Sequence, residues 1–237
     1  MNNYTIKYLF GFTDGQQRQF EFNFNPDTQE MISDQAENAP WTELDFHRCR
    51  NCTLQATDHP YCPIATNLQP LIAFCSDRIS HDEVHIEVVD SERKISLDTT
   101  IQRGISSVLG LIMASSACPH TLFLRPMARF HLPFASHEET VYRATSMYLL
   151  AQYYINKESG HQDNDLTQLR QYYHSLQAVN RDMAKRLRAA SLEDAAANAI
   201  TLLDLYAKAV PYSIEEALDE IKPLFSVYLS NKHYSQE

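Results

Sequence analysis

The chain has 237 residues, 44% of them hydrophobic, and a formal net charge of −10 at pH 7. This length supports one large domain or two small ones, each with a real core. The acidic balance argues against a general nucleic-acid binder, and the 5 glycines with no glycine-rich phosphate loop argue against a nucleotide-cradling fold.

The first forty residues predict a β-hairpin. Aromatic and polar residues mix from Tyr4 to Phe12, and they alternate strictly from Phe20 to Phe24, with Asp14-Gly15 between the two runs. We expect one aromatic face to be buried. Residues 27–40 are polar and end in proline, which favours a short helical turn and a loop. The first residues also lack the apolar core of a signal peptide, so we expect a cytoplasmic protein.

Three of the five cysteines then follow closely, with the spacing C-x2-C-x9-C. They are Cys49, Cys52 and Cys62, and Cys118 repeats the Cys-Pro step of Cys62. A C-x2-C pair places two thiolates close together on one tight turn, at a spacing that suits a tetrahedral metal ion. Two more ligands must come from elsewhere in the chain. Proline directly after a ligand stiffens the ligand loop. We expect one metal site with Cys49, Cys52, Cys62 and Cys118 as ligands.

The metal and the last ligand stay open at this stage. Zinc and an iron–sulfur cluster both accept such cysteines, and base rates favour structural zinc. His47 and His59 are reserve ligands if Cys118 lies elsewhere. A disulfide framework fits less well, because the cysteine count is odd and the chain is long enough for a real core. Cys75 lies in an apolar run, and we expect it to be a small buried hydrophobe.

Helices and a second hairpin are predicted after the cysteines. Apolar residues recur at helical spacing from Ile64 to Ile79, where Pro70 threatens a kink. Alternation at 83–88 and 94–97 about the turn 90–92 predicts the second hairpin, and Thr99 or Thr100 suits the N-cap of a helix that continues to about residue 112.

The last hundred residues read as helical. Ser136 and Glu139 form a capping-box pattern before a tyrosine-rich helix that reaches about Lys157. A further helix is expected over 165–190, an alanine-rich one from 191 to before Pro211, and a last one capped by Ser213. Residues Arg181, Lys185, Arg186 and Arg188 read as the solvated face of a helix.

A second group of polar residues surrounds the apolar segment 124–134. Two interpretations compete for it: an anion-binding or acid/base site beside the metal, with Arg129 and His131 as its centre, or ordinary surface pairs such as Glu139 with Arg143 at i,i+4. The surface interpretation fits better. Signatures of a serine hydrolase, a di-iron carboxylate protein and a zinc deaminase are missing from the sequence.

The chain also resembles an uncharacterised bacterial domain family, from the first hairpin to near residue 210. The resemblance rests on the Asp-Gly hairpin and on four segments, which are Trp41-Thr42-Glu43-Leu44-Asp45-Phe46-His47 before the C-x2-C pair, His59-Pro60-Tyr61-Cys62-Pro63, LRPMARFHLPF at 124–134 and YLLAQYY at 148–154. The family implies no known activity.

The expected fold is α+β, in which two β-hairpins form a small antiparallel sheet, followed by a cysteine metal loop and a C-terminal helical bundle. Residues 1–135 would form the α+β half and 136–237 the bundle, packed together as one unit. The expected function is that of a bacterial metal-binding module with structural zinc and a protein partner. Alternatives are an iron–sulfur redox or sensor protein and an enzyme with a site near Arg129 and His131. No membrane span is expected, and a homodimer is compatible with the tyrosine-rich helix.

Overall fold

The computed structural model describes residues 4–32, 37–75, 81–190 and 214–230. Its sheet has five strands in the order β3-β2-β1-β4-β5, and every neighbouring pair is antiparallel. The strands are β1 (Tyr4–Phe12), β2 (Gln17–Phe24), β3 (Met31–Ile32), β4 (Glu83–Val89) and β5 (Lys94–Thr100). Both predicted hairpins are confirmed, and β1 pairs with β4 to join them into one sheet.

The alternation in the strands buries one face of the sheet. Ile6, Tyr8 and Phe10 point into the core from β1, and alternating residues of β2 and β4 join them there. Tyr8 meets Phe22 and Phe10 meets Phe20 edge to face, with ring centroids 6.2 and 5.7 Å apart. Aromatic pairs at this spacing add to the stability that burial alone provides.

Two helices pack on this buried face, α1 (Pro63–Cys75) and α2 (Ile101–Ser115). Phe74 of α1 contacts the rings of Phe10 and Phe20. Gly104 of α2 lies so close to the sheet that a Cβ atom there would be 2.1 Å from Ile86 Cδ1. The Thr100 cap is confirmed, since its side chain accepts a hydrogen bond from Arg103 N.

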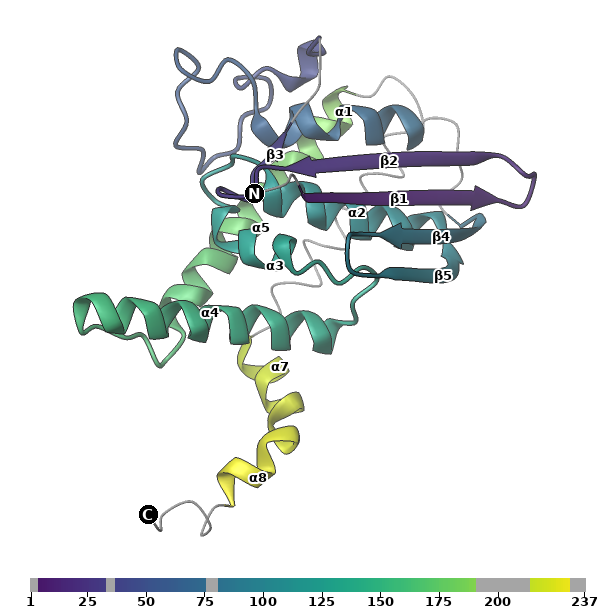
Figure 1. Ribbon diagram of the computed structural model, residues 1–237. Coiled ribbons are helices and arrows are strands. Elements are labelled where there is room, and N and C mark those ends of the chain that lie inside the picture. The colour runs from purple at the N-terminus through teal and green to yellow at the C-terminus, as the bar shows by residue number, and fades with distance from the viewer. Residues whose placement is uncertain (1–3, 33–36, 76–80, 191–213, 231–237) are drawn as a thin grey trace.

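After α2, every regular element in the described residues is a helix, and turns and loops connect these helices (Figure 1). Short turns η2 (Leu122–Leu124) and α3 (Arg125–Arg129) lead to α4 (His137–Ser159) and α5 (Thr167–Ala190). After the gap come α7 (Ile214–Ile221), η3 (Lys222–Phe225) and α8 (Ser226–Leu229). The capping box of Ser136 and Glu139 is confirmed, and Gly160 ends α4 in the left-handed conformation that glycine adopts easily.

The predicted bundle takes a more open form. α7 and η3 lie against α4, where the rings of Phe225 and Tyr142 stack with centroids 6.4 Å apart, whereas α5 lies against η1 (Pro40–Thr42) and the cysteines. Figure 1 shows α7 and α8 extending away from the sheet. The division at residue 135 stays a prediction.

Several boundaries differ from the prediction. Residues 27–40 include the short strand β3, whose pairing with Asn23 and Phe24 no local pattern announces. Pro70 lies inside α1, and that helix is described only to Cys75. The predicted alanine-rich helix at 191–210 and the predicted cap at Ser213 lie outside the described residues. Every helix in the described ranges is too short or too polar to cross a lipid bilayer.

Candidate metal centre and adjoining pocket

The first three cysteines lie on one closed loop, residues 43–62, called the cysteine loop below. Its ends are held together by a bridge between Glu43 and Tyr61 and by the hydrogen bond from Leu44 N to Pro60 O at 2.8 Å. Within it, Cys52 N donates to Cys49 O at 3.0 Å, which is the tight turn expected of a C-x2-C pair. The backbone therefore fixes the ends of the loop and the turn at the first two cysteines.

The four predicted ligand cysteines are free thiols. Cys62 is buried, and Cys49, Cys52 and Cys118 are half-buried. Burial and the neighbouring thiols of Cys62 and Cys118 raise the pKa of Cys49 to about 12. Burial, with smaller contributions from Cys62 and Cys52, raises the pKa of Cys118 to about 11. Each thiol thus lies within electrostatic reach of others in the set.

The side chains are not arranged as a finished coordination shell. In the part of the chain that the structure describes, no three His, Cys, Asp or Glu side chains converge closely enough to hold a metal ion. Some of these thiols raise the pKa values of others, and coordination of one ion would require the sulfurs to move together. Buried thiols with raised pKa values are protonated at neutral pH, which makes them poor nucleophiles.

Both Cys-Pro steps direct backbone N–H groups at sulfur. The N–H groups of Ile64 and Ala65 hydrogen-bond to the Cys62 sulfur and lower its pKa against the stronger effect of burial. At the second step, the N–H of His120 and the side chain of Thr121 do the same for Cys118. Hydrogen bonds of this kind favour the thiolate, which is the form that binds metals.

Helix α5 fastens the cysteine loop from the other end of the chain. Arg186 is 1% exposed and donates to the carbonyl oxygens of Trp41, Glu43 and Leu44 at 2.9, 2.6 and 2.9 Å. Its positive charge lowers the pKa of both Cys49 and Cys62. No carboxylate among the described residues lies within ion-pair distance of it.

One turn earlier in α5, Asp182 binds the loop beside the first cysteine. Its carboxylate accepts from Arg50 N, Nε and Nη2 at 2.9–3.0 Å and from Lys185 Nζ at 3.0 Å. The hydrogen bonds from Arg50 hold the pKa of Asp182 well below its usual range. Asn51 adds a hydrogen bond to Ser175 O, and His120 binds Asn51 O at 2.5 Å.

The prediction that Arg181, Lys185, Arg186 and Arg188 form a solvated face is therefore wrong for Arg186. The other three are exposed. Arg186 follows Met183 by three residues and Val179 by seven, so it continues the buried stripe of α5. Asp182 follows Val179 by three residues and is buried too. In the sequence, Asp182 and Arg186 occupy positions at helical spacing from buried apolar residues, and this spacing could have predicted that they are buried.

The reserve ligands take other positions. His47 and His59 are exposed, and the ring of His47 packs on Phe46 with centroids 5.0 Å apart. The N–H of His59 donates to Gln55 O within the loop. Cys118 is in electrostatic contact with another predicted ligand, because its thiol raises the pKa of Cys49.

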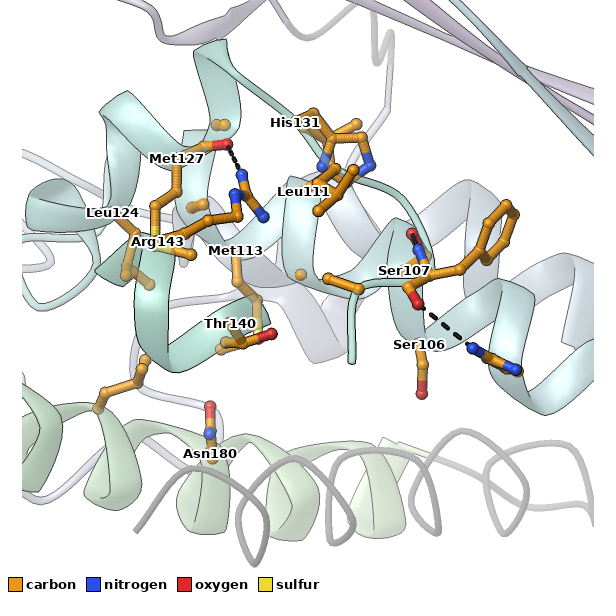
Figure 2. A pocket seen from close by; sticks show the side chains of 18 of the residues that line it. Ser106, Ser107, Leu111, Met113, Leu124, Met127, His131, Thr140, Arg143 and Asn180 are labelled. Atoms are coloured by element: carbon orange, nitrogen blue, oxygen red, sulfur yellow. Dashed lines mark hydrogen bonds between the residues drawn. The ribbon is translucent and has the colours of Figure 1, made fainter. Parts of the chain in front are cut away.

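The predicted pair Arg129 and His131 is divided between two environments. The Arg129 guanidinium lies 4.5 Å from the ring centre of Tyr4. His131 lines a pocket together with residues of α2, α3, α4 and α5 (Figure 2). Its Nε2 hydrogen-bonds to the Tyr8 hydroxyl, which in turn lies 2.7 Å from Ser107 Oγ. Burial, reinforced by Arg143, lowers the pKa of His131 to about 3, so the ring is neutral.

The surface interpretation of the same region agrees with the exposure of the first turn of α4 and is wrong about the ion pair. His137 and Glu138 are exposed in the first turn of α4, in agreement with a surface position. Arg143, however, donates to Met127 O and Phe130 O at 3.0 and 2.6 Å instead of pairing with Glu139, whose carboxylate caps Ser136 N. The predicted i,i+4 ion pair is therefore wrong.

The comparison with protein families gives one result. A family model described as "Domain of unknown function (DUF6901)" matches residues 6–226. No curated protein and no solved structure matches the chain. The match runs from the first strand through η3 and so includes the four predicted ligand cysteines, Arg186 and the pocket. The chain belongs to the DUF6901 family.

Proposed function

We propose that this chain is a structural zinc protein of the bacterial cytoplasm that acts as a binding or regulatory module. Cys49, Cys52, Cys62 and Cys118 would hold one zinc ion. The observation that carries this proposal is Arg186, a buried guanidinium without a carboxylate partner among the described residues, beside the thiols of Cys49 and Cys62.

The charge of Arg186 needs a counterpart. Buried charges in proteins are paired or lie at metal sites, because an isolated one costs several kcal/mol. Four neutral thiols supply no negative charge. Four thiolates around Zn²⁺ carry a net charge of −2, which a neighbouring guanidinium offsets. The three carbonyl groups of residues 41, 43 and 44 hold that guanidinium in place.

The donor set fits a structural ion. Four sulfur ligands close the tetrahedral shell of zinc, and no position stays open for water or substrate. The N–H groups directed at Cys62 and Cys118 favour the thiolate form of these residues, which is the form that a zinc ion binds. The ion would fasten the cysteine loop to the turn after α2, next to the place where α5 already binds it.

The decisive experiment measures metal and stability together. The chain is purified without oxygen, and its metal content and visible absorption spectrum are recorded. About one zinc per chain without visible absorption supports the proposal. Several irons with a broad visible band would instead establish the alternative iron–sulfur protein, which would use the same cysteines. A chain without metal, purified under conditions that retain zinc, would refute both.

Variants then separate the site from general thiol effects. Cys49→Ser and Cys118→Ser should each lose the zinc and melt at lower temperature, since the energy of a structural site is folding energy. Cys75→Ser is the matched control and should keep the metal content of the wild type. If Cys118→Ser keeps its zinc, His47 or His59 takes the fourth position, and His59→Ala in the Cys118→Ser background decides between them.

A partner surface is the second part of the proposal. The outer side of α4 exposes the apolar side chains of Leu149, Leu150, Tyr153 and Tyr154, each more than 40% accessible. Single exposed apolar residues are ordinary, but four in two turns of helix are typical of interaction sites. Light scattering after gel filtration, on the wild type and on Leu150→Glu, tests whether this surface joins two copies of the chain.

A further inference from the structure

No cysteine among the described residues lines the pocket at His131, and α5 contributes residues to the pocket and also contacts the cysteine loop. The pocket has a volume of about 200 Å³ and is lined by residues of α2, α3, α4 and α5 (Figure 2). Its walls are largely apolar and include Leu111, Met113, Leu124, Met127 and Leu176. Several lining residues are half-buried, so the pocket opens to solvent.

One positive charge lies in this apolar wall. The Arg143 side chain reaches the pocket from α4 and is held by the carbonyl groups of Met127 and Phe130. Among residues 4–32, 37–75, 81–190 and 214–230, no carboxylate lies within ion-pair distance of it. Arg103 contributes a second guanidinium at the exposed side and is held by Phe134 O at 3.3 Å. Among the described residues, the lining of the pocket thus has two cationic side chains and no carboxylate.

A buried amide in the same wall also has an unused atom. Asn180 is 2% exposed, and its Oδ1 has no hydrogen-bond partner in the described structure. A buried polar atom without a partner is unfavourable, so its occurrence needs an explanation. Figure 2 shows Asn180 on α5, across the pocket from the Arg143 side chain. A ligand or an ordered water would satisfy it.

We propose that this pocket binds a small monocarboxylate with an apolar body, such as one aromatic ring or a short alkyl chain. The carboxylate would bind Arg143, and the body would lie between Leu111, Met127 and Leu176. A cavity of about 150 Å³ takes up benzene, so about 200 Å³ suits one ring with a carboxylate.

The test compares acids with their neutral amides. Benzoate and hexanoate are titrated into the full-length protein by calorimetry, with benzamide and hexanamide as matched ligands of the same shape. At least one acid should bind with a dissociation constant below about 1 mM, and its amide should bind roughly tenfold more weakly or worse, because a charge-assisted hydrogen bond is lost. If neither acid binds, or if the amides bind equally well, the proposal is wrong.

Two variants locate the binding. Arg143→Gln removes the charge but keeps an N–H donor for the carbonyls of residues 127 and 130, so the fold is retained. It should lower the affinity for the acid roughly tenfold or more. Arg129→Gln is the matched control, because Arg129 lies over Tyr4 and outside the pocket, and it should bind as the wild type does. Equal losses in both variants would place the acid elsewhere. Metal content of both variants should be unchanged, which keeps this test independent of the zinc proposal.

Discussion

Replacing Arg186 with methionine tests the attachment of the cysteine loop to α5. The change keeps most of the side-chain volume and removes three hydrogen bonds to carbonyl oxygens. Hydrogen bonds to a charged donor contribute about 1.5–3 kcal/mol each, so the gross loss is about 4–9 kcal/mol. Removing a buried charge returns several kcal/mol of desolvation energy. We expect a net loss of about 2–4 kcal/mol in the free energy of unfolding.

Urea unfolding, followed by the fluorescence of Trp41, measures this loss directly. Trp41 is the single tryptophan of the chain, and its carbonyl accepts one of the Arg186 bonds. With a urea m-value of about 2–3 kcal/mol/M, the midpoint should fall by roughly 1 M. Arg181→Met, at an exposed position of the same helix, is the control and should change the free energy by less than about 0.5 kcal/mol. Equal midpoints for the two variants would refute the structural role of Arg186.

Three further predictions follow from the core and the caps. In the folded chain the pKa of His131 is lowered from 6.5 to about 3. The unfolded chain therefore binds the proton first, and the free energy of unfolding falls as pH drops from about 6.5 toward 3, by up to about 1.4 kcal/mol per pH unit. The urea midpoints at pH 7 and pH 5 should differ less in His131→Gln than in the wild type, and an equal difference in both would contradict this. Gly104→Ala should cost about 1–3 kcal/mol in thermal unfolding, because the new methyl group would lie 2.1 Å from Ile86 Cδ1 and 2.8 Å from Phe10 Cε1; a neutral result would mean that both side chains move aside. Ser136→Ala should lower the free energy of unfolding by about 1 kcal/mol, because the N-cap of α4 is lost. Unchanged thermal unfolding of this variant would argue against the cap.

The local features of the fold were predictable from the sequence. Alternation placed Phe20, Phe22 and Phe24 on one buried face, and the capping patterns at Thr100 and Ser136 placed two helix starts correctly. These features depend on neighbours within four residues. Strand β3 was not predictable, because two residues carry no period and only pairing with β2 makes them a strand.

The candidate site was predictable in its residue types and not in its surroundings. The spacing of Cys49, Cys52 and Cys62, with the repeated Cys-Pro step at Cys118, singled out a set of thiols in which some raise the pKa values of others. Their joint role as metal ligands stays a prediction. The role of Arg186 depends on a contact with residues more than 140 positions away, which no window of sequence contains. The pocket likewise draws its lining from four helices, and only the folded chain brings Arg143 and Asn180 to one cavity.

The long separation between the cysteine loop and Arg186 also sets an order of events during synthesis. The carbonyl groups of residues 41–44 leave the ribosome 142–145 residues before the guanidinium that binds them. At 5–20 residues per second, the wait lasts roughly 7–30 s. Through that interval the contacts between Glu43 and Tyr61 and between Leu44 N and Pro60 O can close the loop, but the contacts with α5 are missing. The thiols of the C-x2-C pair therefore depend on a reducing environment until α5 has emerged.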